Sequence, residues 1–227
     1  MCKEKDVSAE EEEVSEESEE SESEPIKMPP EARVVGIFQD VNEQKSEEIV
    51  YALKLYSLES TDPVDFYINS GGGTASDMFA MYDFMRQVRE STIIRTHGLG
   101  KVMSAAVLIL AAGTKGERKI GKYCRVMIHA VIAGSSGGLH DLKNEMKEIQ
   151  QTQDMYIDAL SKETKFTKKK LKDLFSTNVN IYLSAEEVLQ KADQINLMIL
   201  CSLFIGIRRR SGKCSLLSSL AIQERNT

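Results

Sequence analysis

The chain has 227 residues, of which 41% are apolar, and a formal net charge of −6. This length and composition are typical of one well-buried globular domain with additional terminal segments. Residues 26–196 carry no net charge, so the body of the chain has no basic excess with which to bind nucleic acid. We therefore expect no nucleic-acid partner.

The first 25 residues hold eleven Glu and one Asp against two Lys, with almost nothing that could be buried. Such a segment cannot offset the entropy lost on ordering, so we predict a disordered acidic leader over residues 1–28. The leader lacks the basic start and apolar middle of a secretory signal. We favour a solvated leader, and an acidic interaction tail or a removable pro-segment remains an alternative.

The cysteines show neither metal-ligand spacing nor the framework of a small disulfide-rich protein. Reduced thiols and a cytoplasmic location are therefore expected. The residues concerned are Cys2, Cys124, Cys201 and Cys214.

The folded part is expected to begin near Arg33, where VVGIF predicts a short strand. EEIVYALKLYSLEST has apolar residues at helical spacing, and VDFYIN is typical of a buried strand. After the three glycines of SGGGTASD we predict a helix with Ser76 as its cap. Its apolar face would consist of Met78, Met81, Tyr82, Met85 and Val88.

The alternation continues with STIIRTHGL as a strand, GKVMSAAVLILAAG as a buried helix and KYCRVMIHAVI as a strand. Alternating strands and helices predict an α/β fold with a parallel sheet covered by helices. A glycine-rich ribbon and a long helix are expected next, and then shorter helices in TKKKLKDLF and SAEEVLQKA. The charged sides of the long helix suit packing against a partner subunit. Its apolar residues are Leu139, Leu142, Met146, Ile149, Met155 and Leu160.

The C-terminal residues 197–227 differ in composition from the body, with a net charge of +4. The mainly apolar stretch from Ile195 to Ile207 is shorter than the roughly 20 residues that span a bilayer, so we predict no transmembrane segment. We favour a buried terminal strand or an extension foreign to the domain over a membrane-surface anchor. No function is assigned to this atypical tail.

Hydrolysis of an amide needs an activated nucleophile, a base, a group that orients the base, and donors for the oxyanion. Ser104 precedes an apolar helix, whose free N–H groups favour developing negative charge, although such a serine can also be a simple helix cap. His129 ends an apolar run at the carboxyl edge of a strand, where open α/β sheets bind ligands. His97 and His140 are competing histidines with no second feature to support them.

Gly71, Gly72 and Gly73 directly follow a buried strand, so their backbone N–H groups can point into a site that side chains would block. A phosphate-binding loop is the rival interpretation. It is weak because no Lys-Ser/Thr pair follows and the spacing is not G-x-G-x-x-G.

Four motifs occur together in the chain: YINSGGG at 67–73, GKVMSAAVLILAAGTKGER at 100–118, RVMIH at 125–129 and YLSAEE at 182–187. On these motifs and their order, residues 33–191 resemble ClpP, the proteolytic subunit of the ATP-dependent Clp protease, which is a serine peptidase family. The resemblance implies a peptidase domain over residues 29–196, built as a crotonase-type spiral of strand-helix units with a strand-helix handle at 134–162.

The resemblance also implies roles for individual residues. Ser104 would be the nucleophile and His129 the general base, with the backbone N–H groups of Gly73 and Ala105 forming the oxyanion hole. The third triad residue of the family, an Asp, falls here on Asn180, whose amide can hold the imidazole but cannot supply charge to the imidazolium. Gly71 replaces a proline that is usual in the family's loop. We expect only a mild effect on the site, because the donor glycines that follow are kept.

Because Asn180 stands where the family has an aspartate, three outcomes are open. The chain is a slower enzyme, or another carboxylate takes the place of the aspartate, or the chain is a catalytically impaired structural ring subunit. The candidate carboxylates are Asp173, Glu186 and Glu187. An acyl-CoA enzyme of the same superfold is a further alternative, but it would not need the Ser–His pair. The family implies polypeptide substrates, two stacked seven-membered rings of the same chain and a separate AAA+ unfoldase that uses ATP. This chain itself is expected to need no cofactor or metal and no membrane.

Overall fold

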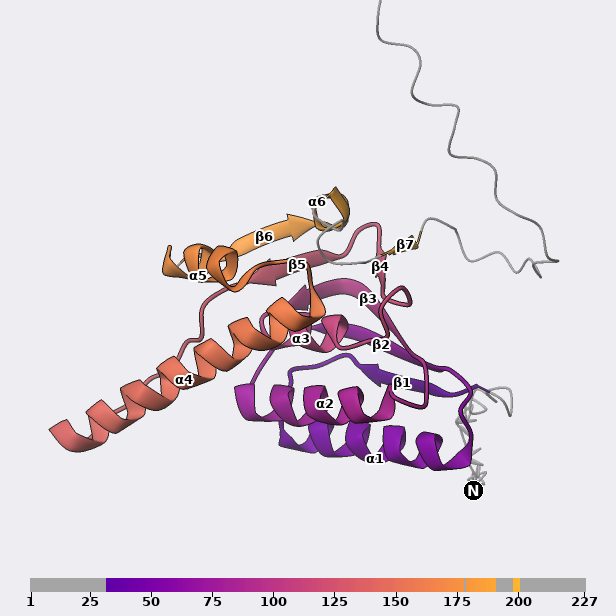
Figure 1. Cartoon of the computed structure of the whole chain (residues 1–227), viewed down its shortest axis with the longest axis horizontal. Helices are drawn as coiled ribbons and strands as arrows, with labels where there is room; N and C mark the ends of the chain where they lie inside the picture. The colour runs from indigo at the N-terminus through magenta and orange to yellow at the C-terminus, as the bar shows by residue number, and fades with distance from the viewer. Residues whose placement is uncertain (1–31, 178, 191–197, 201–227) are drawn as a thin grey trace, which may run out of the picture. The chain divides into compact units, whose positions relative to one another are not determined.

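The computed structural model describes residues 32–177, 179–190 and 198–200 (Figure 1). The predicted leader at 1–28 and nearly all of the tail at 197–227 lie outside the described residues. Among the described residues, no helix combines the length and apolar character needed to cross a membrane.

The centre of the described fold is a mixed sheet in which strand β3 has the most neighbours. On one side β2 pairs with β3 and β1 pairs with β2, both in parallel. On the other side the first half of β3 pairs with β4 and the second half with β5. β7 is parallel to β4, whereas β6 is antiparallel to β5. The strands are β1 (Val34–Ile37), β2 (Val64–Ser70), β3 (Ile94–Met103), β4 (Lys119–Gly121), β5 (Arg125–Ile128), β6 (Ile181–Ser184) and β7 (Met198–Leu200).

Helices connect these strands, as the alternating pattern predicts. Figure 1 shows α1 and α2 side by side against the strands β1 and β2, with α3 next to the C-terminal turns of α4. The predicted apolar face of α2 is confirmed, because all five of its residues are buried. The helices are α1 (Glu43–Glu59), α2 (Ala75–Val88), α3 (Ala105–Ala111), α4 (Leu139–Glu163), α5 (Lys168–Ser176) and α6 (Ala185–Gln190).

The helix predicted over residues 100–113 is wrong in its first turn. Residues 101–103 belong to β3 and pair with residues 125–127 of β5, so helix α3 begins only at Ala105. A short apolar run is equally typical of a buried helix and of a buried strand, so the sequence pattern alone does not distinguish the two. Pairing with β5, which is distant in sequence, decides between them.

Two further predictions need correction. α2 begins at Ala75 with Thr74 in the capping position, so Ser76 lies inside the first turn and is not the cap. The glycine-rich ribbon, residues 133–138, contains no strand in the described chain, so the strand of the predicted strand-helix handle at 134–162 is not found, although the long helix follows as expected. The first four turns of α4 are largely exposed, including Leu139 at 66% and Met146 at 70%, and the buried side chains begin at Tyr156.

Candidate active site

Ser104 and His129 meet at the carboxyl ends of two neighbouring parallel strands. Ser104 directly follows β3 and His129 directly follows β5, and the two strands end in register, with Met103 opposite Met127. The hydroxyl Oγ of Ser104 lies 2.8 Å from Nε2 of His129. The structure therefore brings these two predicted residues within hydrogen-bonding distance.

Ser104 is the only non-glycine residue with positive φ among the described residues, with φ +52° and ψ −124°. Such a conformation is disfavoured by the Cβ atom and persists only where the surroundings hold it. The N–H of Ser104 donates to the carbonyl of Met127 at 2.8 Å, and its own carbonyl accepts the hydroxyl of Tyr156 at 3.1 Å. A sharp turn between strand and helix of this kind exposes the serine hydroxyl.

The imidazole of His129 is held in the tautomer that a base requires. Its Nδ1 contacts the carbonyl oxygen of Ala130. Because a carbonyl can only accept, Nδ1 must carry the proton in the neutral ring, and the lone pair of Nε2 then faces the hydroxyl of Ser104. A neighbouring backbone carbonyl thus occupies the position in which a triad carboxylate would otherwise bind the ring.

A pocket of about 560 Å³ opens beside the two residues. Gly73 and Ala105 line it, and Ala105 is the first residue of α3, so its N–H has no partner within the helix. The remaining lining residues are Asp40, Val41, Thr74, Ala75, Met78, Ala130, Val131, Ile132 and Tyr156.

The glycine loop approaches Ser104 so closely that side chains are excluded. A Cβ on Gly72, whose φ is +99°, would lie 2.6 Å from the Cβ of Ser104. A Cβ on Gly73 would lie 2.0 Å from the carbonyl oxygen of Val41. By contrast, a Cβ on Gly71 would meet only the side-chain ends of Asp40 and Lys101, at 3.4 Å and 3.7 Å.

Asn180 lies near this site in register but does not line the pocket. β5 and β6 pair Ile128 with Ile181, so Asn180, just before β6, and His129, just after β5, both directly adjoin this pair. Its side chain is exposed, and no hydrogen bond joins it to the imidazole within the described part of the chain.

The carboxylates considered as substitutes for a triad aspartate do not line the pocket either. Asp173 is exposed on α5, and Glu186 is exposed in the first turn of α6. Glu187 caps α6: its carboxylate accepts the N–H of Ser184 at 2.7 Å, and its own N–H donates to the hydroxyl of Ser184 at 3.1 Å.

The two competing histidines are also outside the pocket. His97 lies within β3 rather than at its end, with Nε2 2.7 Å from a carboxylate oxygen of Asp65 and its ring stacked on Tyr67. This contact holds the pKa of Asp65 below its usual range, against the opposing effect of partial burial. His140 is exposed in the first turn of α4, as expected.

Sequence reasoning missed two residues of α4 that contact the site. Tyr156 lines the pocket and binds Ser104, and the side-chain oxygen of Gln153 accepts the N–H of Val131 at 3.1 Å. The only available signal was helical spacing, because Gln153, Tyr156 and Leu160 fall on one face at intervals of three and four residues. Among the described residues, no group of three or more His, Cys, Asp or Glu could hold a metal ion.

Comparisons with known proteins agree with the fold and the order of the motifs. A family model described as Clp protease matches residues 17–193. The ATP-dependent Clp protease proteolytic subunit of Borreliella afzelii is 31% identical over 152 residues, covering 64% of this chain and 76% of that protein. Proteolytic subunit 2 of Corynebacterium jeikeium is 32% identical over 170 residues, covering 73% of this chain and 78% of that protein.

A solved structure has the same fold. It is a ClpP1 mutant from Listeria monocytogenes that carries an asparagine-to-aspartate substitution, and it aligns with a TM-score of 0.64 at 24% identity. The alignment covers 74% of this chain and 91% of that chain. The predicted α/β fold is thereby confirmed.

Proposed function

Because this chain belongs to the Clp protease family, we propose that it is a serine endopeptidase subunit that cleaves polypeptides through an acyl-enzyme. One observation carries the proposal: the 2.8 Å contact between Oγ of Ser104 and Nε2 of His129, at the edge of a pocket large enough for a peptide side chain. A simple helix cap would not explain this contact or the positive φ of Ser104.

In the proposed reaction, Oγ of Ser104 attacks the carbonyl carbon of a peptide bond while Nε2 of His129 takes the hydroxyl proton. The C–N bond then breaks as His129 donates that proton to the leaving amine. Water attacks the resulting ester, with His129 again acting as base, and the acid product leaves with Ser104 restored.

The developing oxyanion would be bound by the N–H groups of Gly73 and Ala105, two residues that line the pocket together with Ser104. Backbone donors in fixed positions need no reorganisation during the reaction, and removing one such donor typically costs about 10²–10³ in kcat. The close packing of Gly72 against Ser104 keeps the loop and the nucleophile in one relative position.

We further propose that the chain works in an assembly fed by a separate unfoldase. Its relatives are named ATP-dependent Clp protease proteolytic subunits. Two stacked seven-membered rings would enclose the pockets, and an AAA+ partner would use ATP to deliver unfolded polypeptides. The largely exposed N-terminal turns of α4, which carry apolar side chains, support a role as an assembly surface.

A second candidate is a catalytically impaired subunit that fills ring positions. The observation in its favour is that Nδ1 of His129 contacts the neutral carbonyl of Ala130, while Asn180 occupies the adjacent strand position. Without a carboxylate the imidazolium formed during attack gains less stabilisation, and turnover falls.

Labelling with a fluorophosphonate, together with measurement of native mass, distinguishes the two. A peptidase reacts at Ser104, and both Ser104→Ala and His129→Ala abolish the reaction while the ring mass is retained. Ser135→Ala, in the exposed ribbon, is the matched control and should label normally. An assembled ring that does not label at Ser104 would overturn the peptidase proposal in favour of the impaired subunit.

A further inference from the structure

Tyr156 connects the long helix α4 to the candidate nucleophile. Its side chain is buried, its ring stacks on Phe175 at a centroid distance of 5.8 Å, and its hydroxyl donates to the carbonyl of Ser104 at 3.1 Å. Burial raises the pKa of this phenol, so that it stays protonated and can act only through a neutral hydroxyl.

The hydrogen bond from Tyr156 is made to Ser104, whose positive φ is disfavoured and must be held by contacts with other residues. Among the described residues, the other hydrogen bonds to the Ser104 backbone are made by backbone atoms: its N–H donates to the carbonyl of Met127, and its carbonyl accepts the N–H of Val107 at 3.0 Å. Tyr156 is therefore the side chain, among the described residues, that restrains the peptide plane between the strained serine and α3.

A neighbouring turn of α4 restrains the histidine side of the site. Gln153 accepts the N–H of Val131 at 3.1 Å, two residues after His129. Gln153 and Tyr156 are three residues apart and project from one face of the helix. One rigid element thus contacts the segments that carry both Ser104 and His129.

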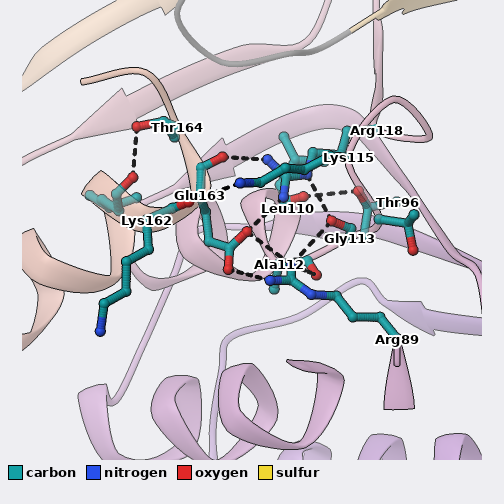
Figure 2. Close-up of polar contacts among 12 residues, drawn as sticks. Arg89, Thr96, Leu110, Ala112, Gly113, Lys115, Arg118, Lys162, Glu163 and Thr164 are labelled. Carbon is teal, nitrogen blue, oxygen red and sulfur yellow. Dashed lines mark hydrogen bonds and ion pairs between the residues drawn. The ribbon is translucent and has the colours of Figure 1, made fainter. Parts of the chain in front are cut away.

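The C-terminal end of α4 is itself fixed by an ionic cluster, which consists of Glu163, Arg89, Arg118 and Tyr82. Figure 2 shows the carboxylate of Glu163 between Arg89 and Arg118. Glu163 is only 2% exposed, and its carboxylate binds Arg89 at 2.6 Å and 2.9 Å and Arg118 at 2.8 Å. Tyr82 donates to the same carboxylate at 3.2 Å. Glu163 lies seven residues after Tyr156, which is two helical turns, so the two side chains share a face.

The same cluster also fixes the far end of α3. Arg89 donates to the carbonyl of Ala112 at 2.9 Å, and Arg118 donates to the carbonyl of Gly113 at 2.8 Å, as Figure 2 shows. α3 begins directly after Ser104. The cluster therefore ties the end of α3 to the end of α4, and Tyr156 joins the two helices again at the nucleophile.

We propose that Tyr156 is a positioning residue for the nucleophile, with the Glu163 cluster holding α4 so that the phenol meets the carbonyl of Ser104. The proposal rests on the proposed function in that Ser104 must be the reacting group. Tyr156 does not exchange protons with the substrate. It restricts Ser104 to the conformation in which Oγ faces the imidazole.

The test compares Tyr156→Phe with Tyr56→Phe in the full chain. Tyr56 also donates its hydroxyl to a backbone carbonyl, that of Val34, but lies away from the pocket, so the control removes the same kind of bond. We expect Tyr156→Phe to lower kcat and the rate of fluorophosphonate labelling by about 10- to 100-fold, because small misplacements of reacting groups have effects of this size. KM should stay within about twofold, because binding of the substrate is unaffected.

A second readout does not depend on catalysis. Amide hydrogen exchange over residues 102–108 should be faster in Tyr156→Phe than in Tyr56→Phe, since the turn at Ser104 opens more often. Incorporating 4-aminophenylalanine at position 156 restores a donor and should restore slow exchange and labelling. Equal exchange over residues 102–108 in the two phenylalanine variants would overturn the positioning role. If the wild-type ring fails to label while residues 102–108 still exchange faster in Tyr156→Phe than in Tyr56→Phe, the result counts against the proposed peptidase function and not against the positioning role of Tyr156.

Discussion

His129 directly follows strand β5, and Asn180 directly precedes strand β6, the antiparallel neighbour of β5. β5 and β6 pair Ile128 with Ile181, so His129 and Asn180 are the residues just beyond this last pair. The imidazole does not use this neighbour, because its Nδ1 contacts the carbonyl of Ala130. An amide side chain, which carries no charge, thus lies at the position next to His129 that we predict to be that of the third triad residue.

We therefore predict that Asn180→Asp raises kcat for a fluorogenic peptide by at least about tenfold. A carboxylate here would compete with the carbonyl of Ala130 for the Nδ1 proton and stabilise the imidazolium, and the reverse change in a serine protease triad costs about 10⁴. Gln87→Glu, which also converts an exposed amide to a carboxylate but lies on α2 outside the pocket, is the control and should leave kcat unchanged. An unchanged or lower kcat in Asn180→Asp would mean that this position is not the third triad residue.

Gly72→Ala should abolish labelling at Ser104. The new methyl would lie 2.6 Å from the Cβ of Ser104 and 2.8 Å from the carbonyl of Met103, so the loop or the nucleophile must move. Gly116→Ala is the matched control, because Gly116 has a similarly positive φ of +89° but open space around it. The control should lose about 1–2 kcal/mol of unfolding free energy from backbone strain and keep its labelling rate. Equal labelling rates in the two variants would contradict the steric explanation.

Glu163→Gln should lower the unfolding free energy by about 3 kcal/mol or more in denaturant titrations. The substitution leaves the buried guanidinium of Arg118 and the partly buried guanidinium of Arg89 without a countercharge, and breaking a buried ion pair typically costs about 3–5 kcal/mol. Asp158→Asn, which removes exposed bridges to Lys162 and Lys168, should change stability little. Similar losses of unfolding free energy in Glu163→Gln and Asp158→Asn would show that the Glu163 ion pairs stabilise the fold no more than exposed ion pairs do.

The same cluster predicts a pH dependence. Burial would raise the pKa of Glu163, but the hydrogen bonds and charges of Arg89 and Arg118 outweigh it and lower the pKa below its ordinary value of 4.5. A carboxyl whose folded-state pKa is depressed stabilises the fold above its unfolded pKa and loses that contribution as the pH falls. The stability difference between wild type and Glu163→Gln should therefore shrink as the pH is lowered below about 4.5. A difference that stays constant down to pH 2 would contradict this.

Cys124 is predicted to be unreactive in the folded chain. It is 1% exposed, and burial raises the pKa of its thiol to about 11, so little thiolate forms near neutral pH. Alkylation by iodoacetamide, followed at the peptide containing Cys124, should be slow in buffer and fast in denaturant. Equal alkylation rates in buffer and in denaturant would show that the turn between β4 and β5 leaves the Cys124 thiol accessible to solvent in the folded chain.

Local patterns in the sequence determined much of the fold. The alternation of apolar strands and amphipathic helices predicted the α/β architecture, and the buried face of α2 from Met78 to Val88 follows directly from a spacing of three and four residues. The pairing of Ser104 with His129 was also within reach, because each directly follows a strand and parallel strands end at one edge of a sheet. These features depend on neighbouring residues, which a single sequence displays.

Contacts between distant residues were decided only by the tertiary structure. The residues before Ser104 are a strand rather than a helix because β5, more than twenty residues later, offers them hydrogen bonds. Tyr156 reaches Ser104 across 52 residues, and Glu163 reaches Arg118 across 45 and Arg89 across 74. Periodicity marks the buried face of a helix but not the group it will face there, because that depends on how separate elements pack.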